Sequence, residues 1–178
     1  MKMEEYAASV MEQTFDFSLP QGLAAEFAAV LTAEFGEESL PEAEQILEAF
    51  RRAYTGRKEP IRFKKCTVTD LEADNGDILT RVHVTYRNHG EEKEFDGAGN
   101  GPVDAMQRGL EKELGIKIKV QDYREHAMGT GSGAQAAAYI LLQNMETEEE
   151  TYGAGISSSI TRSAFRALFS AVNRLYFM

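Results

Sequence analysis

The first 60 residues carry apolar side chains at helical spacing. The stretch LPQGLAAEFAAVLTAEFG predicts a helix that Gly36 can end. The stretch SLPEAEQILEAFRRAYTG predicts a second helix, with Ser39 as N-cap, Glu42 three residues later and Gly56 as the stop. Residues 1–13 are compatible with a further helix. The apolar stripes of these helices are packing faces rather than cofactor sites. In the first helix the stripe consists of Leu23, Phe27, Val30 and Leu31.

From residue 61 onward the apolar spacing changes to a period of two. IRFKKCTVTD and ILTRVHVTYRN predict two strands, separated by a turn at Asn75-Gly76. EEKEFDGAG predicts a third strand, which the chain reaches through the turn at 88–90. Pro102 then opens a helix that Gly115 ends.

The same order of elements begins again after Gly115. A shift of 56 residues places the GAG at 97–99 on the GAG at 153–155, and Asn88 on Asn144. Self-similarity at a fixed offset indicates a structural repeat. The sequence therefore predicts two β-β-β-α units related by a pseudo-twofold axis.

We predict an α+β fold in two parts. A helical linker subdomain covers 1–58, and a second domain covers 59–178, with repeats at 61–115 and 117–175. The last predicted helix, within SSSITRSAFRALFSAVNRLYF, is apolar around much of its circumference. Such a helix is covered on more than one side, so we expect helices packed against and between the sheets, or a helix at a dimer interface.

Composition and charge narrow the class of protein. The chain has 178 residues, 43% of them hydrophobic, and a formal net charge of −10. This charge argues against nucleic acids and anionic membranes as partners. No apolar run approaches the roughly 20 residues of a membrane span, and MKMEEYAASVMEQ is unlike a secretory signal. One cysteine fits a reducing compartment. We expect a soluble cytoplasmic protein.

The stretch GAGNGPVDA at 97–105 is the first candidate for chemistry. Its glycines precede a helix, whose first amides are unpaired donors suited to an anion. It is no dinucleotide fingerprint, because Pro102 stands where the third glycine would be, and no G-K-[ST] follows for a phosphate loop. Two interpretations remain at this stage: a small carboxylate held by the amides of 99–104, or glycines that only turn the chain from strand to helix.

Other chemically suggestive residues do not compose an active site. His126 and Glu125 are neighbours on a predicted strand and point to opposite faces, so a structural or solvent-facing His126 is favoured. His83 and His89 lack the spacing of a zinc site, and Cys66 is interpreted as a half-buried small side chain. The glycines of GTGSG (129–133) can cover a ligand or form a hairpin, and ETEEE (146–150) is interpreted as a solvated loop. We therefore predict no catalytic residues, no metal and no cofactor in this chain.

Several longer strings resemble one family. GAGNGPVDAMQRGL, VQDYREHAMGTGSGAQAAAYI and YGAGISSSITRSAFRALFSAVNR resemble the C-terminal allosteric, dimerisation domain of 2-isopropylmalate synthase. LPQGLAAEFAAVL and PEAEQILEAFRRAY resemble the helical linker that precedes that domain in the longer form of the enzyme. The resemblance covers roughly residues 18–175 and implies the same pair of β-β-β-α units.

The resemblance also implies a ligand. That enzyme catalyses the committed step of leucine biosynthesis and is inhibited by leucine, so the resemblance implies leucine binding and a homodimer. The backbone end of leucine would lie around Gly99, Asn100, Gly101 and Asp104. The aliphatic pocket would be formed by Val103, Val120, Tyr123, Ala127, Ala134 and Ile160.

Three positions depart from the family pattern. Asp104 stands where a small apolar residue is common, and its carboxylate could pair with the ligand ammonium or repel the ligand carboxylate. The GTGSG loop lacks acidic residues often found there, and Tyr152 stands where tryptophan is common.

The catalytic part of that family is absent from this sequence. Its (β/α)8 barrel, which uses a divalent metal held by an H-x-H pair and an acid, needs at least about 200 residues. We therefore expect a non-catalytic regulatory domain, either a piece of a longer enzyme that supplies the barrel as a partner or a free-standing paralogue. A citramalate-synthase-like domain that senses isoleucine, and a dimerisation module with lapsed ligand binding, are the alternatives.

Overall fold

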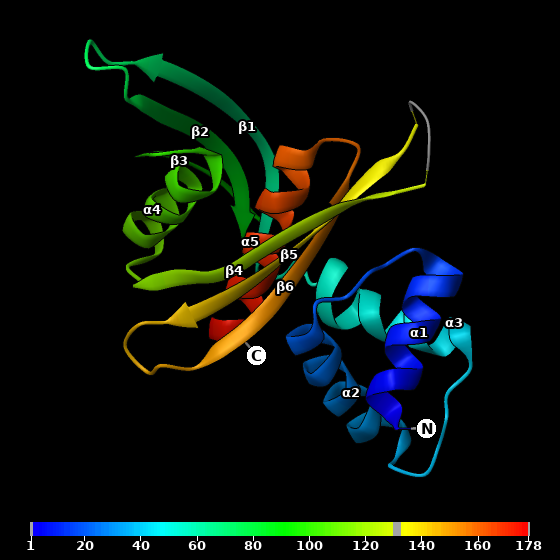
Figure 1. Cartoon of the computed structure of the whole chain (residues 1–178). Helices are drawn as coiled ribbons and strands as arrows, with labels where there is room; N and C mark the ends of the chain where they lie inside the picture. Colours follow the sequence, from blue (N-terminus) through cyan, green and yellow to red (C-terminus); the bar gives the residue numbers. More distant parts are fainter. Residues whose placement is uncertain (1, 130–132, 178) are drawn as a thin grey trace.

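The computed structural model describes residues 2–129 and 133–177 (Figure 1). The N-terminal part is helical, and a five-residue π-helical segment, η1, follows α3 directly. Its elements are α1 (Met3–Phe15), α2 (Gln21–Phe35), α3 (Ala43–Phe50) and η1 (Arg51–Thr55). The first repeat consists of β1 (Ile61–Glu72), β2 (Ile78–Asn88), β3 (Glu91–Gly99) and α4 (Pro102–Leu114). The second repeat consists of β4 (Ile118–Met128), β5 (Gln135–Asn144), β6 (Glu150–Ser157) and α5 (Ile160–Tyr176).

The two predicted β-β-β-α units are confirmed. Each unit forms its own three-stranded antiparallel sheet, in the orders β1-β2-β3 and β4-β5-β6. The first strand of each sheet has a register shift near its start, at Phe63/Lys65 in β1 and at Val120/Asp122 in β4. The repeat seen in the sequence is therefore also a repeat of backbone geometry.

Helix α5 lies between the two sheets (Figure 1). It packs on β5 and β6 on one side and reaches β1, η1 and α4 on others. One apolar cluster joins both sheets to both repeat helices and includes Phe63, Tyr86, Met106, Ile140 and Phe165. The expectation of a helix covered on more than one side is confirmed, and the physical reason is that α5 buries ten of its residues.

Strand β5 is buried on both faces. Ala138, Ile140 and Leu142 face the core around α5, whereas Ala137 and Tyr139 join a second cluster formed with α1, α2 and α3. Alternate residues of a strand point to opposite faces, so the continuous apolar run in β5 reflects cover on both sides. The N-terminal helices therefore pack on the outer face of the second sheet.

The predicted ends of the helices are correct with one exception. Gly36, Gly56 and Gly115 follow their helices as predicted. Ser39, however, does not cap the second predicted helix, because α3 begins only after Pro41 and Glu42 is its N-cap. The reason is that the residue before a proline is disfavoured in helical conformation, and a reciprocal pair between Glu42 and Gln45 caps the helix instead.

The glycines of both GAG stretches lie where a helix approaches a strand closely. A Cβ added to Gly99 would lie 2.8 Å from the Ala105 amide nitrogen of α4, and one added to Gly155 would lie 2.6 Å from the Ala167 amide nitrogen of α5. Real Cβ contacts are longer than this. Helix packing therefore accounts for these glycines, independently of any ligand.

We predict that the substitution Gly153→Ala destabilises the protein. The added methyl group would meet the Ala171 Cα at 2.7 Å and further backbone atoms of α5, so α5 has to shift within its core. Overpacking of this kind costs about 1–3 kcal/mol, measurable as a lower midpoint of urea unfolding. Gly133→Ala is the matched control, because no atom of the described residues lies within 4 Å of its added Cβ. Equal effects of the two substitutions would contradict the packing explanation.

Candidate functional site

A cavity of about 240 Å³ opens between the start of α4 and the start of α5. Of the ten residues predicted to bind leucine, five line it: Gly101, Val103, Asp104, Tyr123 and Ile160. Pro102, Thr161 and Ala164 complete the lining. The first repeat supplies α4 and the second supplies β4 and α5, so the cavity exists only because the two repeats pack together.

The other predicted residues divide into two groups. Ala127 and Ala134 line a neighbouring cavity of about 320 Å³, which also touches Ile160. Gly99, Asn100 and Val120 line neither cavity: Gly99 is buried under α4, Asn100 is exposed, and Val120 packs against the main core. The single predicted pocket is thus two adjoining cavities that meet at Ile160, a residue 56% exposed. Positions 130–132 of the GTGSG loop lie outside the described residues.

Asp104 places a carboxylate at the start of α4. Its Oδ2 accepts hydrogen bonds from the Asn100 amide (2.9 Å) and from the Arg108 Nε (3.1 Å). A negative charge at this end of a helix is favourable, because the helix dipole is positive there. Its Oδ1 has no hydrogen-bond partner among the described residues. The side chain therefore uses the Asn100 amide through one oxygen and leaves the other oxygen without a partner among the described residues.

Two further polar groups near the cavities have structural partners. The Tyr123 hydroxyl donates to the Glu125 carboxylate at 2.7 Å, and burial, with this carboxylate, raises the pKa of Tyr123. The His126 Nε2 lies 2.7 Å from the Tyr139 hydroxyl and accepts a hydrogen bond from the Ser18 amide. His126 thus attaches the segment after α1 to the second sheet, which confirms its predicted structural role.

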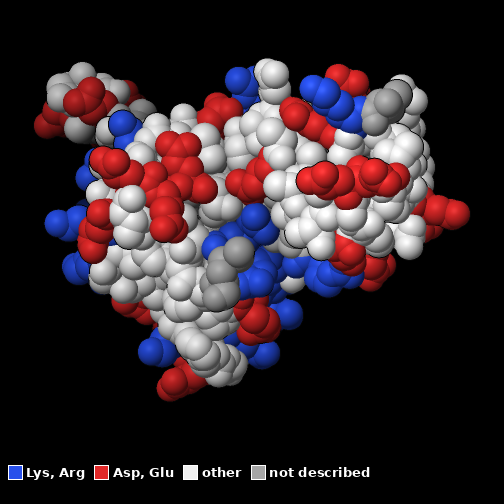
Figure 2. Space-filling model, turned by 90° about the horizontal axis from the view of Figure 1, so that it is seen from below, with Lys and Arg blue, Asp and Glu red and all other residues white. Residues whose placement is uncertain are grey.

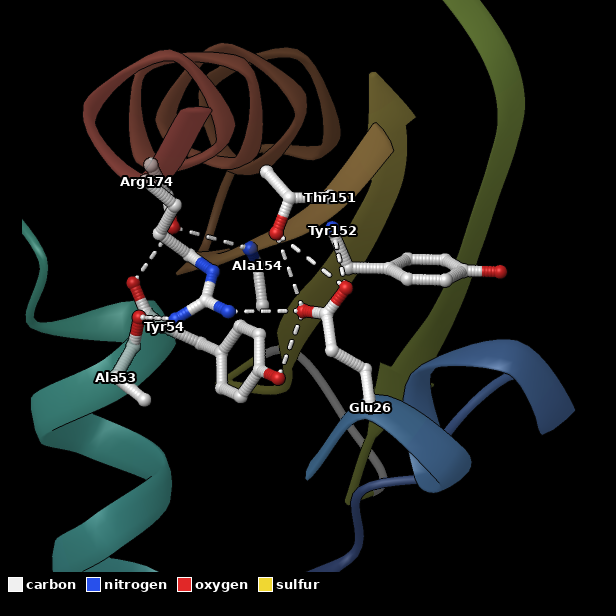
Figure 3. Close-up of polar contacts among 8 residues, drawn as sticks. Glu26, Ala53, Tyr54, Thr151, Tyr152, Ala154 and Arg174 are labelled. Atoms are coloured by element: carbon white, nitrogen blue, oxygen red, sulfur yellow. Dashed lines mark hydrogen bonds and ion pairs between the residues drawn. The ribbon is translucent and has the colours of Figure 1, made fainter. Parts of the chain in front are cut away.

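A buried ion pair that the sequence analysis missed joins four elements (Figure 3). The Arg174 guanidinium of α5 donates to the Glu26 carboxylate of α2 at 2.9 Å, with side chains only 9% and 25% exposed. Arg174 also donates to the Ala53 carbonyl and lies over the Tyr54 ring, with its Cζ 4.1 Å from the ring centroid. This pair connects the C-terminal turn of α5 to the N-terminal helices.

Glu26 collects three more hydrogen bonds. The Tyr54 hydroxyl donates at 2.8 Å, the Thr151 hydroxyl at 3.3 Å and the Tyr152 amide at 3.2 Å (Figure 3). Burial, and next the Glu26 charge, raise the pKa of Tyr54. One signal in the sequence could have found this site, since position 26 lies on the apolar stripe of its helix between Leu23 and Val30. A carboxylate on such a stripe needs a buried partner.

The remaining reactive residues show no sign of catalysis. Cys66 is half-buried, and burial raises the pKa of its thiol to about 11. His83 is exposed and bonded to Asp96, and next to Glu94, contacts that raise its pKa. Residues 145–150, which include ETEEE, are exposed as predicted. Within the described ranges no group of three or more His, Cys, Asp or Glu could hold a metal ion, and no helix is long and apolar enough to cross a membrane.

One family model matches most of the sequence that forms the two repeats and the segment before them. The sequence pattern of the LeuA allosteric (dimerisation) domain matches residues 42–176. The chain belongs to this family. The LeuA match covers η1, both repeats and the cavity between α4 and α5, and it confirms the resemblance seen in the sequence.

The relatives of this LeuA domain are whole biosynthetic enzymes. The 2-isopropylmalate synthase of Pseudomonas fluorescens (strain SBW25) is 37% identical over 169 residues, which are 94% of this chain and 29% of that enzyme. The 2-isopropylmalate synthases of Parvibaculum lavamentivorans and Corynebacterium glutamicum (strain R) are each 32% identical, with 28% and 26% of their lengths covered. The chain thus spans less than a third of the curated relatives it matches, and the matched LeuA domain is itself non-catalytic.

We predict that Glu26→Gln lowers the free energy of unfolding by about 1.5–3 kcal/mol, the range for hydrogen bonds to charged groups. The neutral amide leaves the Arg174 charge without its partner. Glu34→Gln is the matched control on the same helix, because Glu34 pairs with Arg52 at an exposed position, where such pairs contribute less than about 1 kcal/mol. Urea unfolding of both variants tests this, and equal losses would contradict a special role for Glu26.

We predict that Cys66 alkylates slowly at neutral pH and that its rate rises with pH through about 11, the pKa of the buried thiol. In urea-unfolded protein the rate should rise at lower pH, near the ordinary thiol pKa of 9.0. Iodoacetamide kinetics followed by mass spectrometry measure both profiles. A folded-state midpoint at or below the unfolded one would show that the thiol is activated instead of protected.

Proposed function

We propose that the cavity between α4 and α5 binds a branched-chain amino acid, leucine in the first place, and that the chain acts as a feedback-regulatory domain. The observation that carries the proposal is the pairing of an apolar wall with one unpartnered carboxylate oxygen. Val103, Tyr123 and Ile160 form the wall, and Asp104 Oδ1 is the acceptor that has no partner among the described residues. The cavity volume of about 240 Å³ is below the roughly 300–1,000 Å³ of pockets for drug-sized ligands, so the cavity suits a smaller ligand such as an amino acid.

Each part of an amino acid has a counterpart in this cavity. The isobutyl group lies against the wall, where its burial contributes about 1.5–3 kcal/mol. The ammonium pairs with Asp104 Oδ1, because an opposite charge at a partly shielded site forms a strong hydrogen bond. The ligand carboxylate accepts from the Val103 and Asp104 amides at the start of α4, since Pro102 has no N–H and the Ala105 amide already donates to the Gly101 carbonyl. This arrangement assigns Asp104 to the ammonium and away from the ligand carboxylate.

Binding in this cavity can influence the helical linker through α5. Ile160 and Ala164, in the first turns of α5, line the cavity, while Arg174 in its last turn holds Glu26 of the linker. A ligand that prefers one placement of α5 would therefore also favour one placement of the linker. In a synthase that supplies a catalytic barrel, this is the route by which leucine would inhibit at a distance, with two copies of the domain paired.

We predict that leucine raises the midpoint of thermal unfolding more than isoleucine or valine does, because ligand binding to the folded state adds stability. Asp104→Asn keeps the shape of the side chain but removes the charge that pairs with the ammonium, and it should weaken leucine binding by roughly tenfold or more. Calorimetric titration measures this change.

Asp74→Asn, in the exposed turn after β1, is the control and should bind leucine like the parent chain. Tighter binding by Asp104→Asn would contradict the assignment of the ammonium. No stabilisation by any of the three amino acids would contradict the proposed function and leave pairing of copies as the role of the domain.

A further inference from the structure

A third cavity, of about 180 Å³, lies between the start of β1, the segment that leads into it and the side of α5. Its lining is dominated by cations, together with Thr55, Ile61, Phe63, Phe169 and Ser170. The cations are Arg57, Lys58, Arg62, Lys64, Arg162 and Arg166. An adjoining cavity of about 300 Å³ shares Lys58 and Arg166 and adds Arg51. We call the cavity of about 180 Å³, with its six cations, the basic cavity.

The basic cavity contrasts with the charge of the whole chain. The formal net charge is −10, yet Figure 2 shows lysine and arginine atoms gathered in the hollow between two lobes of the molecule. Among the described residues the only carboxylate paired with any of the six cations is that of Glu59, at 3.6 Å from Arg62. Five of the six positive charges therefore lack a counter-ion within the part of the chain that the structure describes.

The arginines of α5 are held in place with donors to spare. Arg162 donates to the Lys64 carbonyl at 3.1 Å and lies over the Phe63 ring, 5.0 Å from its centroid. Arg166 donates to the Ile156 carbonyl at 2.7 Å. Each guanidinium has five N–H donors in a planar fork, so most of them remain free. Two more N–H donors of the basic cavity, the Nε groups of Arg57 and Arg62, are buried and have no hydrogen-bond partner among the described residues.

The crowding of like charges costs stability in the free protein. Burial, and then Arg166 and Arg62, lower the pKa of Lys58. Burial and then Arg162 lower the pKa of Arg166. Both directions mean that the folded protein disfavours these positive charges. A cleft lined by charges of one sign concentrates ions of the opposite sign, so this group of cations suits an anionic ligand.

We propose that the basic cavity binds a small phosphate-bearing anion, such as a diphosphate group, at a site separate from the proposed amino-acid site. Guanidinium forks fit the geometry of phosphate oxygens in pairs, and Lys58 and Lys64 supply point charges. A multivalent anion matches the excess of cations better than a single carboxylate does. The cavity has room for the phosphate groups and leaves the remainder of a larger ligand in the adjoining cavity.

Such a ligand would connect three segments of the chain. Lys58 belongs to the segment between η1 and β1, Lys64 belongs to β1, and Arg162 and Arg166 belong to α5. One anion that contacts all three would cross-link them by charge-assisted hydrogen bonds. We therefore expect binding to stabilise the folded state of the whole chain.

The test uses pyrophosphate, without metal ions, against sodium chloride at the same ionic strength. We expect pyrophosphate to raise the midpoint of thermal unfolding beyond the chloride reference, and Lys58→Gln to weaken its binding by roughly tenfold or more. Lys58 makes no hydrogen bond with another described residue, so the variant breaks no internal contact. Because it relieves repulsion, it should also raise the midpoint of the free protein at low salt. Lys65→Gln is the matched control, since Lys65 is an exposed lysine on β1 that does not line the cavity.

Three results would overturn the proposal. The first is a pyrophosphate effect no larger than that of chloride, which would mean charge screening alone. The second is an equal loss of pyrophosphate binding in Lys58→Gln and Lys65→Gln, which would place the anion elsewhere. The third is stabilisation by malonate as strong as that by pyrophosphate, which would make the site a dicarboxylate site. Leucine binding is measured separately in the absence of pyrophosphate, so that failure of this proposal and failure of the proposed function can be told apart.

Discussion

The structure depends on the burial of α5 between two sheets and a helical segment. Apolar contact alone would allow this helix to slide or rotate, but three polar side chains specify its position. Asn173 donates to the Ile61 and Arg57 carbonyls and accepts from the Ile61 amide, and Ser170 donates to the Tyr54 carbonyl. Arg174 completes the set through Glu26. Buried polar groups are costly unless satisfied, so these bonds exist together in only one arrangement of α5.

Both proposed sites follow from that arrangement. The first turns of α5 form one wall of the amino-acid cavity, and the Arg162 and Arg166 side chains form one wall of the basic cavity. Glycines at 153 and 155 let α5 approach β6 closely enough for the sheet and the helix to share a core. A ligand at either site would thus act on the same helix, which is in turn fastened to the linker. This shared helix gives a physical basis for coupling between sites.

Much of the fold could be predicted from the sequence, because the information is local. Alternation in β1 and β2, the Asn75-Gly76 turn and the 56-residue repeat need only neighbouring residues for their interpretation. The predicted start of α3, at Ser39, was wrong because the proline at position 41 disfavours helical conformation in the residue before it. What local reading could not supply is contact between distant residues: Glu26 with Arg174, His126 with Ser18, and the cations of β1 with those of α5. The ten ligand residues came from the family resemblance, and the structure places seven of them in two adjoining cavities and three outside both.

Native-state hydrogen exchange tests most directly whether α5 unites the linker and both repeats into one cooperative unit. The account predicts that buried amides of α2, η1 and α5 exchange through the same global opening, with equal free energies and equal dependence on denaturant. Exchange of the α2 and η1 amides through a separate opening, at lower free energy and with little denaturant dependence, would contradict it. In that case the helical segment would be an independent attachment and could not transmit a signal from α5.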